Sequence, residues 1–234
     1  MKRFDVIILC GGKGERLRPL TYIAPKPLTK IKNKPFLYYL IKFFLKKNFK
    51  NIVIACGYKS NLFQLFLKKY FKNKKNITFI DSGDVDVLKR IKDAEEYIDN
   101  DFFVCYGDAF AAIDINKYTK FFNSLKKGNA TILGSIYRLQ FGILKVNKKN
   151  DKITKFLEKP KIKEPINIGY FIFNKNTFKI ISNFKKWINF LNYLIKRKKL
   201  NFYSFNGLHL TFNNMGELQI AKSKIKDIEN FLDN

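Results

Sequence analysis

The first 106 residues alternate between short apolar runs and stretches of helical spacing, and this alternation restricts the fold more than any other feature. Four runs have the bounded, β-branched character of buried strands: residues 4–9, 51–56, 77–80 and 102–106. Between them, apolar residues recur at helical spacing over residues 36–48, 62–71 and 87–98. Short loops between such elements require right-handed crossovers and a mostly parallel sheet, whose ligand site lies beyond the carboxyl ends of its strands. We therefore predict an α/β fold with its site at that edge.

A glycine-rich loop follows the first predicted strand, starting at Cys10. Its three glycines leave no side chain to hold a ligand away, and they let successive backbone N–H groups point toward one anion; they are Gly11, Gly12 and Gly14. Arg16 and Arg18 add two guanidinium groups, each of which can grip two phosphate oxygens. A turn that only reverses the chain is the alternative, but such a turn needs no arginines. We predict that this loop binds a polyphosphate.

Two commoner phosphate-binding loops do not fit this sequence. A dinucleotide-binding loop requires a third glycine where Leu17 stands, and an acidic residue at the end of the second strand, where the sequence is Ala55-Cys56-Gly57. A Walker loop ends in Gly-Lys-Ser or Gly-Lys-Thr, and neither tripeptide occurs in the chain. The polyphosphate site is therefore of another type.

Asp108 follows the fourth predicted strand, so it belongs to the same edge of the sheet as the glycine loop. A carboxylate there can hold Mg²⁺ between the protein and a bound triphosphate, because Mg²⁺ prefers oxygen ligands. Asp108 is our first metal candidate, and a turn-forming aspartate is its alternative. Asp114 is expected to cap a helix over residues 115–127, and Ser60 is expected to cap the helix over residues 62–71.

Beyond residue 129 the pattern changes to shorter apolar runs separated by turns: residues 130–137, 141–146, 153–158 and 167–173. Glu158 and Lys159 end the third run. A phosphorylated sugar needs both groups, since the lysine can meet the phosphate while the carboxylate accepts sugar hydroxyls. A charged β-turn is the alternative reading. A last amphipathic helix is predicted over residues 216–231, where its apolar face serves either the core or a dimer contact.

The composition favours a folded protein that does not cross a membrane. The 234 residues are 46% hydrophobic and 16% aromatic, which is too much for a disordered chain. No run approaches the roughly 18 apolar residues that span a bilayer. The chain enters its first strand almost at once, which leaves no room for a signal peptide and predicts a cytoplasmic location. One domain, residues 1–234, is expected at this length.

The formal net charge of +27 permits a nucleic-acid partner. Lysines are spread over every predicted helix and turn, however, which fits a general compositional bias better than a binding face, so we expect no nucleic acid and no membrane partner. The three cysteines, Cys10, Cys56 and Cys105, lack metal or redox spacing and are expected to be buried thiols. His209 has no histidine or thiol nearby in the sequence and is expected to be structural.

The glycine loop and the Pro25-Lys26-Pro27 segment behind it resemble the signature of the sugar-1-phosphate nucleotidyltransferases. Further motifs follow in order and resemble the glucose-1-phosphate cytidylyltransferase branch in particular. These motifs are Cys56-Gly57-Tyr58-Lys59, Asp81-Ser82-Gly83-Asp84, Leu88-Lys89-Arg90, Tyr106-Gly107-Asp108, Phe141-Gly142, Glu158-Lys159-Pro160 and Asn167 with Gly169-Tyr170-Phe171. The match extends from residue 4 to about residue 175.

The resemblance implies a Rossmann-like nucleotidyltransferase fold, with an NTP-binding half over residues 1–128 and a β-rich sugar-phosphate-binding half over residues 129–234. It implies that a sugar 1-phosphate attacks the α-phosphate of an NTP, for which CTP is our first choice, and that Mg²⁺ is the cofactor. Arg16, Lys26 and Asp108 are the implied catalytic residues. Gly83 and Asp84 join the glycine loop in binding the nucleotide, and the implied substrate-binding residues are Gly142, Glu158, Lys159 and Asn167.

The sequence departs from this family near its carboxyl end, where a metal-binding aspartate is expected. Asn213 and Asn214 stand there, and either could offer a carbonyl oxygen to Mg²⁺; we take Asn214 as the second ligand beside Asp108, with Glu217 as a substitute. Val85-Asp86-Val87 replaces glycines of the cytidylyl branch. GTP, UTP, dTTP or a non-sugar acceptor therefore remain alternatives, as does a catalytically weak binding protein; a basic nucleic-acid-binding domain and the oligomeric state also stay open.

Overall fold

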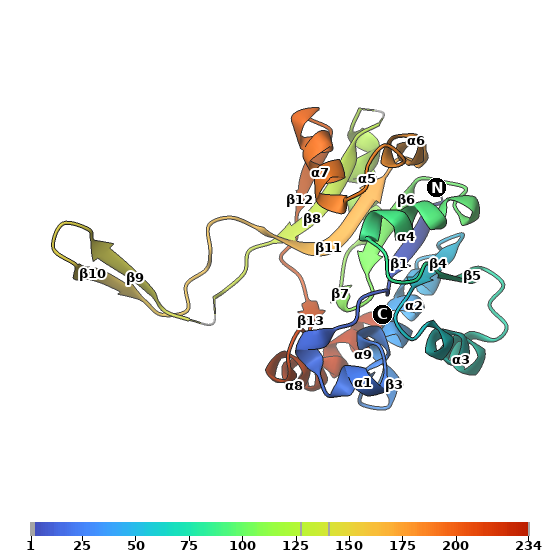
Figure 1. Cartoon of the computed structure of the whole chain (residues 1–234), viewed down its shortest axis with the longest axis horizontal. Coiled ribbons are helices and arrows are strands. Elements are labelled where there is room, and N and C mark those ends of the chain that lie inside the picture. The colour runs from blue at the N-terminus through green and yellow to red at the C-terminus, as the bar shows by residue number, and fades with distance from the viewer. Residues whose placement is uncertain (1–2, 127, 140, 234) are drawn as a thin grey trace.

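The computed structural model describes residues 3–126, 128–139 and 141–233. A seven-stranded sheet has the order β12-β8-β11-β6-β1-β4-β5. Its strands are β1 (Asp5–Leu9), β4 (Ile52–Cys56), β5 (Ile77–Asp81), β6 (Phe102–Tyr106), β8 (Ala130–Ser135), β11 (Ile166–Phe173) and β12 (Leu200–Ser204). Only β11 runs antiparallel to its neighbours within this sheet. The predicted α/β fold with a mostly parallel sheet is confirmed, and both halves of the chain contribute strands to the one sheet (Figure 1).

Alternate residues of β1 belong to two separate apolar clusters, one on each face of the sheet. Val6 and Ile8 join one cluster, and Ile7 and Leu9 join the other. This is the two-residue period of a strand that is buried on both faces. The first cluster includes side chains of α2 (Phe36–Lys46), α3 (Ser60–Phe71), α5 (Ile115–Ser124), α8 (Met215–Ser223) and α9 (Ile225–Asp233). The second includes α4 (Val87–Asp93), α6 (Phe178–Ile181) and α7 (Trp187–Lys196).

The remaining elements are short. The helix α1 (Leu20–Ile23) and the hairpin of β2 (Lys30–Ile31) with β3 (Lys34–Pro35) follow the glycine loop. An antiparallel pair joins β7 (Ala109–Ala111) to β13 (His209–Thr211). Single 3₁₀ turns cover Glu15–Leu17, Lys26–Leu28, Glu95–Tyr97 and Lys175–Thr177. In the described ranges no helix is long and apolar enough to cross a bilayer.

A two-stranded arm leaves the body of the molecule between β8 and β11. It consists of β9 (Ile143–Asn147) and β10 (Lys152–Leu157), which pair only with each other, and it projects far to one side of the main sheet (Figure 1). Phe141 and Phe156 on the arm are 79% and 60% exposed. The runs predicted as strands here are therefore strands, but in this structure they do not extend the sheet.

Several element boundaries differ from the sequence prediction. The helix expected over residues 87–98 ends at Asp93 and continues only as a 3₁₀ turn. The helix expected over residues 216–231 breaks at Lys224, after which α9 turns its apolar face onto α2. Asp114 caps α5 by accepting the Lys117 N–H at 3.0 Å, as predicted, although α5 ends at Ser124. Ser60 is not the cap of α3, because Lys59 enters the helix in a left-handed conformation with φ of 51°.

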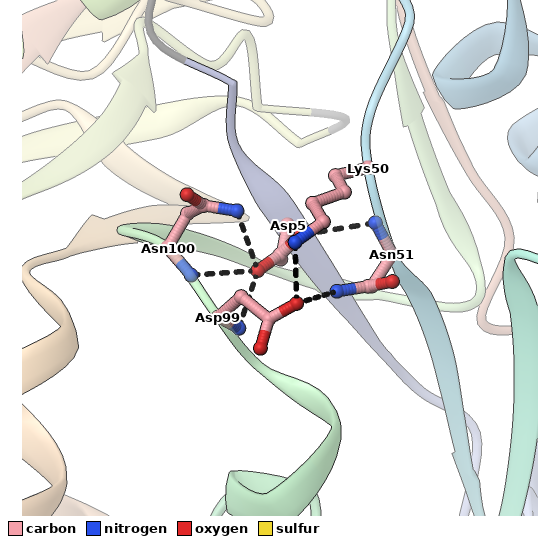
Figure 2. Close-up of polar contacts among 5 residues, drawn as sticks. All are labelled: Asp5, Lys50, Asn51, Asp99 and Asn100. Carbon is pink, nitrogen blue, oxygen red and sulfur yellow. Dashed lines mark hydrogen bonds and ion pairs between the residues drawn. The ribbon is translucent and has the colours of Figure 1, made fainter.

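A buried carboxylate fixes the amino end of β1. Asp5 is fully buried and accepts hydrogen bonds from the backbone of Asn51, Asp99 and Asn100 at 2.8–2.9 Å, and from the Asn100 side chain at 3.2 Å (Figure 2). Asp99 in turn pairs with Lys50 at 2.7 Å. These contacts join the first residue of β1 to the loops that precede β4 and β6, so they lie at the opposite end of the strands from the glycine loop.

Candidate active site

The glycine loop leaves β1 and closes into a 3₁₀ turn that is held from inside the protein. Gly14 begins this turn with φ of 63°, a left-handed conformation that glycine adopts without strain. The Thr21 hydroxyl donates to the Gly14 carbonyl at 3.1 Å. A Cβ on Gly14 would lie 3.0 Å from the Thr21 methyl group and 3.2 Å from Cβ of Lys26. The loop conformation is therefore set by close packing against the Pro25-Lys26-Pro27 segment.

Lys26 brings the loop segment, the end of β6 and the segment after β13 together. Its side chain is 10% exposed, and its Nζ donates to Oδ2 of Asp108 and, at 3.1 Å, to Oδ1 of Asn213. Nζ also lies 5.4 Å from the centre of the Phe212 ring. Asp108 can reach this point because β6 lies beside β1 and because Gly107 has no side chain; a Cβ there would lie 2.5 Å from Sγ of Cys10.

These groups surround one cavity of about 290 Å³ at the carboxyl ends of β1 and β6. Seven residues predicted for nucleotide binding or catalysis line it: Cys10, Gly11, Gly12, Gly14, Arg16, Lys26 and Asp108. It is also lined by residues to which the sequence analysis assigned no role, namely Leu9, Pro27, Val87, Arg90 and Tyr106, and by Asn213, the alternative to Asn214 as a metal ligand. A larger cavity of about 630 Å³ lies against Phe4, Phe49 and α5, where none of the predicted site residues are found. The smaller cavity is therefore the candidate active site.

The two asparagines near the carboxyl end have different roles. Oδ1 of Asn214 accepts the Glu217 N–H at 2.9 Å and so caps α8. The Glu217 carboxylate accepts the backbone N–H of Asn213 at 2.7 Å. Asn214 and Glu217 are thus engaged in the cap. The side chain of Asn213 accepts a hydrogen bond from the Lys26 ammonium through Oδ1 at 3.1 Å and donates to Glu217 through Nδ2 at 3.1 Å. The spacing Asn214-x-x-Glu217 is that of a capping box, so the sequence itself indicates that Asn214 caps a helix.

The donor set around Lys26 fits a hard cation. A carboxylate oxygen of Asp108 and the amide oxygen of Asn213 already converge on one positive charge, the Lys26 ammonium. Oxygen atoms of these two types are ligands for Mg²⁺, which usually retains several waters and takes only one or two protein carboxylates. No cluster of three or more His, Cys, Asp or Glu side chains suited to a metal occurs in the part of the chain described here. Asp108 with Asn213 is therefore the set that fits.

Gly83 and Asp84 lie in the turn after β5, beside the cavity but outside its lining. The Gly83 N–H donates to Oδ1 of Asp81 at 2.9 Å, and Gly83 has φ of 70°. Asp84 pairs with Lys13 of the glycine loop at 2.7 Å. Their hydrogen bond, more than the charge attraction, raises the pKa of Lys13 and lowers the pKa of Asp84. This exposed pair joins two loops that both border the cavity.

The predicted substrate-binding residues lie away from this lining. Gly142, Glu158 and Lys159 belong to the projecting arm and its base, where Gly142 packs against the Phe156 ring and Glu158 lies 3.8 Å from Lys159. Asn167, on β11, accepts the Gly169 N–H at 2.8 Å, and its side chain also contacts Tyr106 of the cavity lining. The structure thus brings together the nucleotide and metal candidates, with Asn213 in place of Asn214, and leaves three of the four substrate candidates on the arm.

The three cysteines and His209 have the environments expected of buried structural residues. All three cysteines are buried and free, and burial raises the pKa of the Cys56 and Cys105 thiols. Burial also lowers the pKa of His209 to about 4, and its Nε2 is buried with no hydrogen-bond partner among the described residues. His209 is therefore neutral near pH 7.

The fold and the site together define an α/β nucleotide-binding protein with a glycine loop opposite a carboxylate. Residues 5–197 match the family described as nucleotidyl transferase. The chain belongs to this nucleotidyl transferase family, as the sequence motifs predicted.

The matches to curated relatives cover different shares of those proteins. "Bifunctional protein GlmU" of Methanocaldococcus jannaschii is 31% identical, and the match covers 87% of this chain and 50% of that protein. The chain thus spans about half the length of this relative. "Glucose-1-phosphate cytidylyltransferase" of Salmonella typhimurium is 30% identical over 76% of this chain and 77% of that protein. Among solved structures, HddC from Yersinia pseudotuberculosis superposes with a TM-score of 0.72 at 26% identity, covering 95% of this chain and 99% of that one.

Proposed function

We propose that this protein transfers the nucleotidyl group of an NTP to a sugar 1-phosphate, forming an NDP-sugar and pyrophosphate. The observation that carries the proposal is the convergence of the glycine loop, Lys26 and Asp108 on one cavity at the carboxyl ends of β1 and β6. Membership of the nucleotidyl transferase family supports the reaction class. The arrangement of the cavity and the family membership both support the proposal.

CTP is the first candidate for the NTP. The Salmonella typhimurium relative is named a glucose-1-phosphate cytidylyltransferase, and the sequence motifs resemble that branch. A Campylobacter jejuni relative, 29% identical, is named D-glycero-alpha-D-manno-heptose 1-phosphate guanylyltransferase, so GTP is the main alternative. UTP and dTTP follow it.

In the proposed reaction an oxygen of the sugar phosphate attacks the α-phosphorus of the NTP, and the bond from that phosphorus to the bridging oxygen of the β-phosphate breaks. Pyrophosphate leaves with the bonding electrons, and no covalent bond to the protein forms. The attacking oxygen belongs to a phosphate that is already ionised, so the step needs no general base. Placement and charge stabilisation supply most of the rate in such transfers.

The residues of the cavity have roles that follow from where they lie. The glycine-loop amides and Arg16 are suited to the leaving pyrophosphate, and the nearly buried Lys26 is suited to charge that builds on the α-phosphate. Asp108 and the amide oxygen of Asn213 would hold Mg²⁺. A divalent cation bound there supplies positive charge that neutralises phosphate oxygens and orients them.

The proposed binding site for the sugar 1-phosphate is supported by the family resemblance and not by the cavity. Its candidate residues Gly142, Glu158 and Lys159 lie on the arm. We propose that Lys159 binds the phosphate of the sugar 1-phosphate with the arm brought toward the cavity. A Lys159→Met variant is then expected to raise KM for the sugar phosphate about tenfold, the loss of one charge-assisted hydrogen bond, with KM for the NTP unchanged. Lys155→Met removes a charge from the same arm and is the matched control; equal effects of both variants would remove Lys159 from the acceptor site.

The reaction is tested by incubating the protein with Mg²⁺, each of the four NTPs in turn and a panel of sugar 1-phosphates, and following pyrophosphate release. Release with one NTP at a much higher kcat/KM identifies the base. Absence of release with every pair would instead favour a binding protein that has lost turnover. Tight DNA or RNA binding that survives physiological salt would favour the nucleic-acid alternative.

A further inference from the structure

Arg90 on α4 is a buried arginine at the floor of the candidate active site. The residue is 5% exposed, and it belongs to the cavity lining. Its guanidinium donates to the carbonyls of Val85 at 2.6 Å, Gly83 at 2.7 Å and Gly11 at 3.2 Å, with a longer contact to the carbonyl of Cys56 at 3.5 Å. One side chain thus contacts the last residue of β4 and the segments that follow its two neighbours, β1 and β5.

Two glycines leave the space that this guanidinium group occupies. A Cβ on Gly11 would lie 1.8 Å from Nε of Arg90. A Cβ on Gly57 would lie 2.9 Å from Nη2 of Arg90 and 2.2 Å from the Gly83 carbonyl oxygen. Because four carbonyls hold the guanidinium, it cannot move aside as an exposed side chain would. The glycine loop therefore rests directly on Arg90 at Gly11.

The hydrogen bonds of Arg90 all go to backbone carbonyls. No carboxylate of the described residues forms an ion pair with it; Asp84, on whose carboxylate the charge of Arg90 also acts, pairs with Lys13. A buried charge without a counter-ion is costly, and a nearby anion lowers that cost. The cavity beside Arg90 is where the triphosphate is proposed to bind, so bound NTP would supply the missing negative charge.

We propose that Arg90 is a positioning residue for the NTP. It fixes Gly11 and the Gly83–Val85 turn relative to each other, so that the loop amides are already oriented when the nucleotide arrives, and its charge favours the anionic ligand. This inference rests on the proposed function, because it assumes that the cavity binds an NTP. A residue that only stabilised the fold would weaken both substrates alike, whereas Arg90 is expected to act on the NTP alone.

The test compares Arg90→Lys and Arg90→Gln with the wild type. Lysine keeps the charge but cannot bond four carbonyls from one plane, and glutamine removes the charge. Calorimetric titration with CTP and with GTP, in the absence of sugar phosphate, is expected to show Kd raised at least about tenfold by Arg90→Lys and further by Arg90→Gln, which is the loss of one or more charge-assisted bonds. In turnover, KM for the sugar phosphate is expected to stay within about twofold.

Two controls complete the experiment. Lys89→Ala removes an exposed neighbouring charge on α4 that pairs with Asp93, and it is expected to leave NTP affinity unchanged. Arg90→Ala leaves a cavity, and millimolar guanidinium is expected to restore part of its NTP affinity while methylammonium does not.

The proposal is overturned if Arg90→Lys binds NTP as tightly as the wild type, if both substrates weaken equally, or if every Arg90 variant unfolds at 25 °C, because Arg90 is then only a residue of the fold. A wild type that binds NTP but releases no pyrophosphate would reject the proposed reaction and still allow the Arg90 comparison. A wild type that binds no NTP would overturn both.

Discussion

The two ends of the central sheet each carry an aspartate, and the two differ in how their oxygens are used. At the amino end, Asp5 is fully buried and its carboxylate accepts four hydrogen bonds, three from backbone N–H groups and one from the Asn100 side chain (Figure 2). At the carboxyl end, the Asp108 side chain is 28% exposed and its one hydrogen bond within the described chain comes from the Lys26 ammonium. A carboxylate whose acceptor capacity is filled by backbone N–H groups serves the fold, while one that faces a cavity retains capacity for a ligand.

The largest expected effect tests the carboxyl end. Asp108→Asn keeps the shape of the side chain and removes the charge that would hold the cation, so kcat is expected to fall by about 10³ or more. Because the Lys26 side chain of this pair is only 10% exposed and keeps its charge, the free energy of unfolding is expected to fall by about 1–2 kcal/mol. Steady-state kinetics and urea denaturation measure the two quantities. Full activity in this variant would remove Asp108 from the proposed role.

The same substitution at the amino end is expected to cause a larger loss of stability and no loss of kcat. Asp5→Asn places an amide NH₂ against N–H donors and breaks charge-assisted bonds, so the free energy of unfolding should fall by about 2–4 kcal/mol. The folded fraction should keep the wild-type kcat, because Asp5 lies at the far end of β1 from the cavity. Urea denaturation gives the first value and kinetics at 15 °C the second. A loss of kcat without a loss of stability would break the contrast between the two aspartates.

His209, on β13, makes the stability of the folded protein sensitive to acid. Its pKa is lowered by burial from 6.5 to about 4, so between these pH values the unfolded chain binds more protons than the folded one. This contribution to stability is fully present above pH 6.5 and is lost as the pH falls toward 4, at most about 3 kcal/mol. Urea denaturation at pH 7 and pH 4.5 should show a smaller difference for His209→Phe than for the wild type. Equal differences would mean that other groups cause the acid sensitivity.

The smallest expected effect distinguishes Asn213 from Asn214. Asn213→Asp adds a charge to the pair of oxygens around Lys26, and the Mg²⁺ concentration for half-maximal activity is expected to fall about threefold to tenfold. Asn214→Asp is the matched comparison, since its oxygen already caps α8 and no shift is expected. A shift with Asn214→Asp alone would restore the ligand predicted from the sequence.

Local patterns were enough to predict the sheet, the glycine loop and the position of Asp108. Each depends on a strand of about five residues and on the rule that parallel strands end at one edge. Asn213 could not be chosen over Asn214 in this way, because its position depends on the pairing of β13 with β7, about 100 residues apart in the chain. The capping box at Asn214 would have excluded that residue had its spacing been used.

The contacts of Arg90 and the separate pairing of the arm could not be predicted from the sequence, for different reasons. Arg90 lies on a helix whose other residues look amphipathic, and only the three-dimensional approach of Gly11 and Gly57 reveals what it contacts. The runs of the arm have ordinary strand character, and nothing in their alternation says whether β9 and β10 join the main sheet or pair alone. Both cases depend on contacts between segments distant in sequence, which periodicity does not contain.

The pairing of β13 with β7 also has a consequence for the order in which the protein matures. During translation the glycine loop, Lys26 and Asp108 leave the ribosome in the first half of synthesis, and the parallel strands β1, β4 and β6 can assemble around them. The Asn213 oxygen arrives about 100 residues later, when β13 docks beside β7. A nascent chain is thus expected to acquire its proposed phosphate-binding loop well before its proposed cation site, and turnover that needs the cation should begin only after that docking.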